Sequence, residues 1–142
     1  MKTADSIKLV NLVEMTKNMG LAVRDVRNLA AQATRYVAKR AVDRIKKAAP
    51  KDTGTMAKAF KPASRKKWTN TFRADITVNM GSSKEDPAGA WYWHFPDKGT
   101  KMQARQNFFD PAIRATDKEA KGVFEEQVMK RAIRMMKRRA KK

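Results

Sequence analysis

The sequence predicts an α+β domain in which a small antiparallel β-sheet is packed against a long N-terminal helix and a long C-terminal helix. Residues 21–48 and 111–137 repeat apolar side chains every three or four positions, which is typical of amphipathic helices. Between them, residues 71–79 alternate apolar and polar side chains, which is typical of a strand. The 142 residues fit a single domain spanning 1–142, and no regular alternation of strands and helices indicates a parallel sheet.

The N-terminal third is expected to be mostly helical. Residues 6–10 alternate weakly and could form a short strand, and residues 11–17 could form a short helix. The helix over 21–48 is the better defined, because no glycine or proline interrupts it and alanine, arginine and lysine are abundant. Its apolar face is rich in alanine, which allows another backbone to approach closely. Pro50 ends the helix, since the residue before a proline is pushed out of the α region.

The middle of the chain is expected to supply the sheet. Residues 56–63 could be a strand or a ragged extension, and residues 64–70 indicate a basic loop or hairpin turn. Residues 71–79 predict a strand with one buried face, because four apolar side chains alternate with polar ones along it.

An aromatic segment follows a polar loop. Residues 90–95, Ala-Trp-Tyr-Trp-His-Phe, are strongly β-prone and predict a further strand. In that strand Trp91, Trp93 and Phe95 would share one face, which we assign to the core. The next residues, up to 109, indicate a turn and an irregular stretch.

The C-terminal helix has a clear predicted start and an unusual end. Asp110 is a suitable N-cap, and Pro111 suits the first helical position. Arg131 and Arg138 fall inside the apolar sector, and residues 130–142 carry eight basic side chains and no acid. The last turns are therefore expected to leave the core as a basic helical extension that frays in water or reaches a partner.

The charge of the chain narrows its range of partners. Lysine and arginine total 33 against 14 acidic residues, a net charge of +19. Such a surface favours polyanions, either nucleic acid or acidic protein, although a merely solvated basic surface is an equal alternative. The residues expected to make a polyanion or partner contact lie in two groups: Arg65, Lys66, Lys67 and Trp68, and Lys130, Arg131, Arg134, Lys137, Arg138 and Arg139.

Enzymatic chemistry is not expected. Cysteine is absent, which excludes disulfides and thiol catalysis and fits a reducing compartment. His94 is the single histidine, so no second histidine completes a catalytic or zinc site, and no phosphate-loop motif is present. We predict no cofactor and no metal. No apolar run reaches the length of a membrane span, and the first residues do not form a signal peptide.

Two segments together carry a resemblance. The first is Ala-Pro-Lys-Asp-Thr-Gly-Thr-Met at 49–56, directly after the long basic helix. The second runs from Trp91 through His-Phe-Pro-Asp-Lys-Gly-Thr-Lys-Met-Gln-Ala-Arg to Asn-Phe-Phe-Asp-Pro-Ala, ending at Ala112. In this order, between two helices, they resemble the small tail-completion or neck proteins of long-tailed, lambdoid-type bacteriophages. The similarity covers about residues 20–135.

The resemblance implies a structural protein of the phage virion, assembled in the host cytoplasm at the joint between head and tail. Such proteins are thought to form a ring, often sixfold, that joins the tail tube to the head connector and lets DNA pass. The implied partners are further copies of the chain, head-closure or connector proteins, tail terminator or tail-tube proteins, and DNA in the lumen. A free nucleic-acid-binding protein is the alternative.

The family has no catalytic residues to transfer to this chain. Its motifs are expected to be shaped loops that set subunit contacts, although loops that only close the domain are an alternative for each residue. The motif residues are Pro50, Asp52, Thr53, Gly54, His94, Phe95, Asp97, Gly99, Thr100, Met102, Ala104, Phe108, Pro111 and Ala112.

Overall fold

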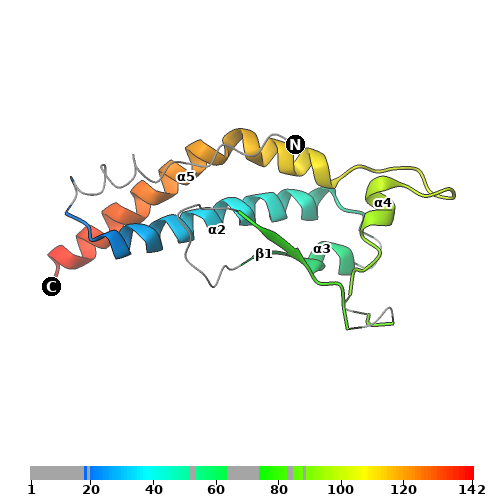
Figure 1. The fold of residues 1–142 in the computed structure, drawn as a ribbon, viewed down its shortest axis with the longest axis horizontal. Coiled ribbons are helices and arrows are strands. Elements are labelled where there is room, and N and C mark those ends of the chain that lie inside the picture. Colours follow the sequence, from blue (N-terminus) through cyan, green and yellow to red (C-terminus); the bar gives the residue numbers. More distant parts are fainter. Residues whose placement is uncertain (1–17, 19, 52–53, 64–73, 83–84, 88) are drawn as a thin grey trace.

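The computed structural model describes residues 18, 20–51, 54–63, 74–82, 85–87 and 89–142. The element order is α2 (Val23–Ala48), α3 (Thr55–Ala59), β1 (Phe60–Pro62), β2 (Ile76–Val78), α4 (His94–Lys98) and α5 (Phe109–Ala140). The predicted α+β class is confirmed, with long N- and C-terminal helices and a small antiparallel sheet (Figure 1). The strand predicted over 6–10, the helix over 11–17 and the basic loop over 64–70 lie outside the described residues.

The two long helices run antiparallel and form one core cluster along their shared face (Figure 1). Ala30 and Ala33 of α2 and Ala132 of α5 are fully buried in this cluster, so the alanine-rich face does admit a close neighbour. Larger side chains, among them Leu29 and Phe124, fill the space beside the alanines. The helix predicted over 21–48 is thereby confirmed within two residues of its observed start.

The prediction that residues 130–142 leave the core is wrong for the first turn of that segment, whereas residues 136–142 are exposed. Val128 and Ala132 are fully buried against α2, and Met135 packs beside them. Near the end of α5, Arg139 Nη2 forms a 2.7 Å ion pair with Asp25 in the first turn of α2. The buried face moves around α5 along its length because the two helices cross, and a fixed helical wheel does not represent that shift.

Within the described residues the sheet has two three-residue strands, and residues 71–73 of the predicted strand over 71–79 lie outside the described part. β1 and β2 pair with Phe60 opposite Val78, Lys61 opposite Thr77 and Pro62 opposite Ile76. The predicted alternation is correct within β2, where the two apolar side chains are half-buried and Thr77 is exposed. The stretch predicted as a strand or extension over 56–63 contains both α3 and β1.

Phe60 lies at the centre of a second core cluster, between the sheet, α2 and the start of α5. It is fully buried, and its ring meets Phe108 and Trp93 edge-to-face at centroid distances of 6.3 and 5.6 Å. Val42 and Ile45 supply the α2 side of the cluster. Through Phe60, the sheet is held against the C-terminal half of α2.

The strand predicted over 90–95 is wrong: this segment forms a turn followed by the short helix α4. Its backbone bonds are local, for example from the Phe95 N–H to the Tyr92 carbonyl at 2.9 Å. Pro96 suits the first turn of a helix, where a missing N–H costs nothing. The high β-propensity of the aromatic residues is overridden because Trp93 packs on Phe60 and Phe109 instead of extending a sheet.

Candidate assembly surfaces

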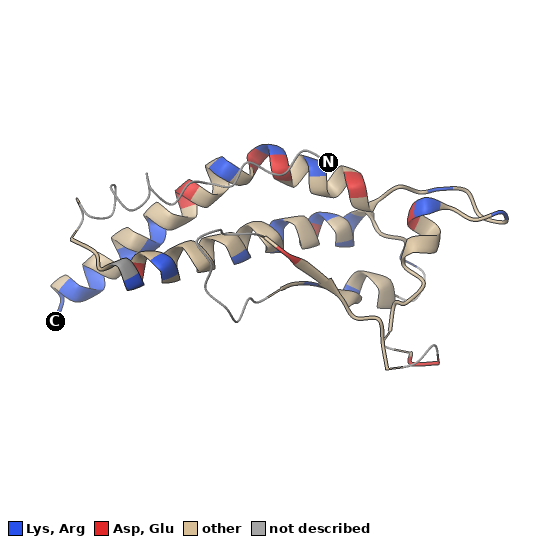
Figure 2. Cartoon of the chain, viewed as in Figure 1, with Lys and Arg blue, Asp and Glu red and all other residues tan. Residues whose placement is uncertain are grey.

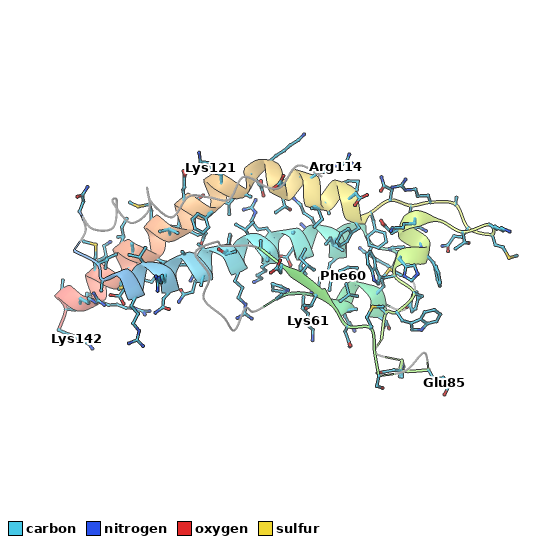
Figure 3. All side chains as sticks on the ribbon, in the orientation of Figure 1. Phe60, Lys61, Glu85, Arg114, Lys121 and Lys142 are labelled. Atoms are coloured by element: carbon cyan, nitrogen blue, oxygen red, sulfur yellow. The ribbon has the colours of Figure 1, made fainter. Side chains whose placement is uncertain are left out.

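The structure brings the two motif segments together at one end of the molecule. Ala49 and Met56 from the first segment share a core cluster with Phe108 from the second, and Tyr92 and Trp93 pack against it. Figure 3 shows this crowding of side chains around the labelled Phe60 and α4. We call this region, residues 49–56 and 90–108, the motif end; of its predicted residues, Asp52 and Thr53 lie outside the described part.

Asp97 links the motif end to the start of α5 by a hydrogen bond. Its side chain is buried, with only 3% exposed, and Oδ1 accepts a 2.9 Å hydrogen bond from the Phe109 backbone N–H. This satisfies one of the unpaired donors at the start of α5. The prediction that Asp110 caps this helix and Pro111 opens it is wrong, because α5 begins at Phe109 and Asp110 already lies within the first turn.

Residues 99–106 form a projecting loop, which we call the finger. Gly99 has φ +81°, and a Cβ there would lie 3.0 Å from the Arg105 backbone nitrogen, so only glycine fits easily. Thr100 Oγ1 accepts bonds from the N–H groups of Met102 and Gln103 at 3.3 and 3.1 Å, and the Gln103 carbonyl accepts the Thr100 N–H. The finger is therefore ordered by its own contacts.

The side chains of the finger point into solvent. Met102 is 98% exposed, and Ala104 is also exposed. At the base of the finger, the Gln106 N–H bonds the Pro96 carbonyl at 2.9 Å and the Asn107 N–H bonds the Asp97 carbonyl at 3.0 Å. These bonds hold the finger against α4, so a methionine with no intramolecular packing is presented on a rigid support.

An apolar surface lies beside the finger. Trp91 and Phe95 meet edge-to-face with centroids 5.9 Å apart, and Phe95 remains 39% exposed. We call this pair the aromatic shelf. His94, next to it, contacts the rings of Phe95 and Trp93 rather than any carboxylate cluster.

The remaining predicted motif residues are mostly structural. Gly54 has φ +75° and precedes α3, which is the turn role expected of it. Phe108 and Ala112 are buried in the second cluster, Pro50 is half-buried after α2, and Pro111 is exposed in the first turn of α5. The motif thus divides into residues that build the end of the domain and residues that project from it.

The opposite end of the molecule is strongly basic, as Figure 2 shows by the blue segments near the C-terminus. We call residues 130–142 of α5 the basic end. Arg134, Lys137 and Arg138 line a shallow open hollow there together with Ala140 and Lys141. The predicted contact residues Arg65, Lys66, Lys67 and Trp68 lie outside the described part of the chain.

Three of the predicted contact residues at the basic end have partners within the chain. Arg139 pairs with Asp25, as described above. Arg131 Nη1 donates to Gln32 Oε1 at 3.0 Å. Lys130 Nζ lies 2.7 Å from Glu126 Oε1, and this carboxylate raises the pKa of Lys130. These three cations hold the helix pair together or sit in local pairs, whereas the hollow is lined by the other three.

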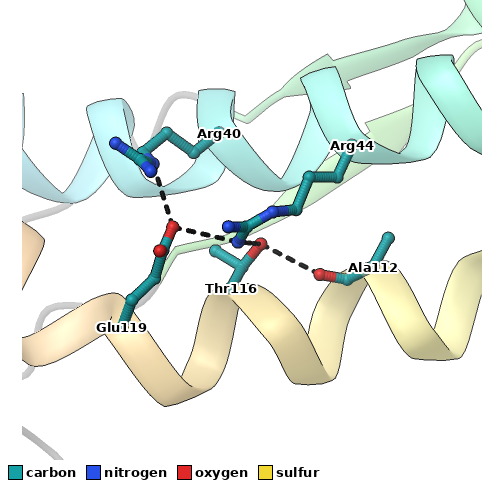
Figure 4. A network of polar contacts seen from close by, with 5 residues as sticks. All are labelled: Arg40, Arg44, Ala112, Thr116 and Glu119. Atoms are coloured by element: carbon teal, nitrogen blue, oxygen red, sulfur yellow. Dashed lines mark hydrogen bonds and ion pairs between the residues drawn. The ribbon is translucent and has the colours of Figure 1, made fainter.

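Sequence reasoning missed a polar network between α2 and α5, drawn in Figure 4. Glu119 Oε1 lies 3.0 Å from Arg40 Nε and 2.9 Å from Arg44 Nη1. Arg44 Nη1 also donates to Thr116 Oγ1 at 2.9 Å, and the Thr116 hydroxyl donates to the Ala112 carbonyl. The hydrogen bond from Arg44, followed by the nearby charge of Arg40, lowers the pKa of Glu119.

A sequence signal for this network exists but is incomplete. Arg40 and Arg44 are four residues apart, and Thr116 and Glu119 three apart, so each pair lies on one helical face. The crossing of the two helices decides which face of α2 meets which face of α5. The spacing of residues within each helix does not predict this crossing. The network joins α2 and α5 at one position along their length, and so favours one displacement of the helices along their axes.

Within the described residues, no group of three or more histidine, cysteine or acidic side chains is placed to hold a metal ion. None of the helices in that part of the chain combines the length and apolarity needed for a bilayer span. The candidate surfaces that the structure describes are the projecting finger with its neighbouring aromatic residues and the basic end of α5.

A family model described as "Bacteriophage HK97-gp10, putative tail-component" matches residues 13–99. This match spans more than half of the chain, so the chain belongs to this family of phage tail components. The resemblance is confirmed at the level of that family, and its extension beyond residue 99 stays a prediction. No curated protein gives a significant match, and no solved structure does either.

Proposed function

We propose that this phage tail-component protein is a tail-completion or neck protein that forms a closed ring, six-membered by family analogy, at the head–tail junction. DNA would pass through the ring. Its neighbours would be a head-closure or connector protein on one side and a tail terminator or tail-tube protein on the other. Family membership supports a structural phage role, and the two ends of the molecule support the finer assignment.

The observation that carries the proposal is the convergence of both motif segments at the end opposite the basic end (Figures 1 and 2). A ring subunit needs surfaces that meet like copies and a further surface for different partners or for the channel. The motif end presents exposed Met102 and Phe95, which suit protein contacts. The basic end suits a polyanion, either DNA or an acidic neighbour.

The test is a stop codon at Trp91 in the phage that carries this gene, with the intact gene supplied on a plasmid as control. Electron microscopy of the lysate should show filled heads and free tails that fail to join, or tails with defective ends. The plasmid should restore joined particles. Normal infectious particles from the stop-codon phage, without the plasmid, would remove the proposal.

A second candidate function is nucleic-acid binding by the free protein. The observation that favours it is the gathering of Arg134, Lys137 and Arg138 around one hollow. Duplex DNA should then bind saturably and weaken steeply with salt. An assembly protein would instead retain binding to its tail or head partner at salt concentrations that abolish DNA binding. Truncation after Met129 is a poor test, because it also removes the fully buried Ala132.

A further inference from the structure

We infer that the finger of one copy docks on the aromatic shelf of a second copy, with Met102 inserted against Trp91 and Phe95. The inference rests on the ring proposed above and specifies the contact that would join neighbouring subunits. Four features of the motif end support it: the exposure of the methionine, the rigidity of its support, the chemistry of the shelf and the distribution of charge.

The Met102 side chain does not pack against its own chain. It is 98% exposed, by far the most exposed of the large apolar side chains in the described residues. An apolar side chain held in water gains free energy when a partner covers it. Because the finger is already ordered by the bonds of Thr100 and by its two bonds to α4, little conformational entropy is lost when it docks.

The aromatic shelf is a suitable partner for a methionine. Phe95 is 39% exposed, and its ring meets Trp91 edge-to-face. A thioether packs favourably against aromatic rings, often at the ring edge. Met80, which is 47% exposed, follows Asn79, whose carbonyl accepts the Ala90 N–H at 2.9 Å, so its segment adjoins the shelf.

Charge favours the same pairing. The finger carries Lys101 and no acid, and also Arg105, whose guanidinium bonds Asn107 Oδ1 at 2.9 Å and lies 3.8 Å from Asp110 Oδ2. The turn between Met80 and Ala90 contains Lys84, Glu85 and Asp86, so one acid is in excess there. Figure 2 shows these as two separate projections at one end of the molecule, one with blue and one with red. In a chain of net charge +19, a contact between copies needs such a place where unlike charges meet.

The finger and the shelf are different surfaces of one copy, so their contact is heterologous. Each subunit offers a finger to one neighbour and a shelf to the other. Contacts of this kind generate closed rings when the rotation between subunits closes. An isologous contact, in which finger meets finger, would bring Lys101 and Arg105 of two copies together.

The absence of cysteine from the chain makes the contact directly testable. The phage carrying the stop codon at Trp91 is complemented with a Met102→Cys, Phe95→Cys double variant, and purified particles are oxidised and run without reductant. We expect a ladder of cross-linked multimers of this protein. The matched control is Met102→Cys with Lys61→Cys, since Lys61 is exposed on β1 and belongs to neither the finger nor the shelf. It should give no ladder of multimers.

The outcomes are separable. Protein present in particles with no ladder above the control overturns the docking contact and leaves the proposed function standing. Absence of the protein from purified particles that are complemented by the intact gene overturns both. Cross-linked dimers from Met102→Cys alone would establish a finger-to-finger contact and overturn the heterologous arrangement.

Substitutions in the native chain provide a second measurement. Met102→Asp should lower the yield of joined particles about tenfold or more, as for an interface hot spot, while Met102→Leu should retain it. Because the side chain is 98% exposed, neither change should alter the circular dichroism or the melting temperature of the purified protein. Equal yields from the two variants would overturn the inference.

Discussion

The buried carboxylate of Asp97 caps α5 from outside that helix, because its Oδ1 accepts the backbone N–H of Phe109 at 2.9 Å. The same residue's carbonyl accepts the Asn107 N–H. One residue of the second motif therefore fixes both the base of the finger and the start of the longest helix. A change at Asp97 is expected to affect fold and assembly together.

Asp97→Ala should destabilise the protein by about 1–3 kcal/mol, because it removes a buried hydrogen bond and leaves a helix-end donor unpaired. Asp97→Asn should cost less, since an amide oxygen can still accept the bond. The matched control is Asp110→Ala, an exposed change in the first turn of α5 that should cost about 0.3–1 kcal/mol, because it removes a helix-dipole interaction and a 3.8 Å surface ion pair with Arg105. Urea unfolding measures all three, and a larger destabilisation from Asp110→Ala would mean that the cap lies where the sequence predicted it.

Two glycines should respond to alanine in opposite directions. Gly99→Ala should destabilise by about 1–3 kcal/mol, because φ is +81° and the new Cβ would lie 3.0 Å from the Arg105 nitrogen. Gly122→Ala should stabilise by about 0.5–1 kcal/mol, because it lies inside α5 and a Cβ there meets nothing within 4 Å. Melting temperatures compare the pair, and changes of equal sign would contradict the finger geometry.

The ion pairs of Glu119 with Arg40 and Arg44 predict that the stability of the protein falls at acidic pH. Arg44 and then Arg40 lower the pKa of this carboxyl from its ordinary value of 4.5. A carboxyl whose pKa is lower in the folded than in the unfolded state contributes stability above pH 4.5, and the contribution is lost as the pH falls through the folded pKa. Glu119→Gln should therefore reduce stability at pH 7 and flatten the fall in melting temperature between about pH 5 and 3.

The control for this experiment is Glu125→Gln, which changes an exposed carboxylate of the same helix. In this variant the fall in melting temperature at acidic pH should stay close to that of the original protein. If both variants give the same profile, the Arg40–Glu119–Arg44 network does not couple α2 to α5 in solution.

Salt dependence should identify which cations meet a polyanion. Replacing Arg134, Lys137 and Arg138 with glutamine should lower the slope of log binding constant against log salt by about 0.9 for each duplex phosphate that these cations neutralise. Arg139→Gln should leave that slope nearly unchanged, because its guanidinium is engaged by Asp25. A titration of duplex DNA by fluorescence anisotropy measures both, and an unchanged slope in the triple variant would exclude this hollow as the DNA-binding surface.

The close approach of the long helices predicts intolerance to larger side chains where they meet. Ala33 is completely buried between α2 and α5, so Ala33→Leu should overpack the core and cost about 1–3 kcal/mol. Ala115→Leu, on the exposed side of α5, should change stability by less than about 0.5 kcal/mol. Thermal unfolding distinguishes the two, and a neutral Ala33→Leu would mean that the helices lie further apart than described.

Much of the fold follows from local pattern alone. Helices over 21–48 and 111–137 are predicted because apolar side chains recur at helical spacing, and Pro50 marks the end of the first; the structure has them at 23–48 and 109–140. The alternation around Ile76 and Val78 likewise predicts a strand with a buried side. The motif segments predict the family, and the match over 13–99, which contains the first segment and the beginning of the second, confirms that family.

The aromatic segment shows why local pattern is insufficient elsewhere. Residues 90–95 have the composition of a strand, yet Trp93 is needed against Phe60 and Phe109, and a turn and helix place it there. The C-terminal turns look too basic to pack, yet Ala132 and the Arg139–Asp25 pair hold them on α2. In both cases contacts distant in sequence outweigh a preference of the segment itself.

The order of residues is enough to predict the helices, the strand alternation, the basic charge and the family. Three further features depend on tertiary packing: Asp97 caps α5, Glu119 joins two arginines of α2, and Met102 stands exposed on a rigid finger. Periodicity reports which side of an element is apolar, because burial repeats with the turn of the backbone. It does not report which elements meet or at what angle, because that depends on packing between residues far apart in the chain.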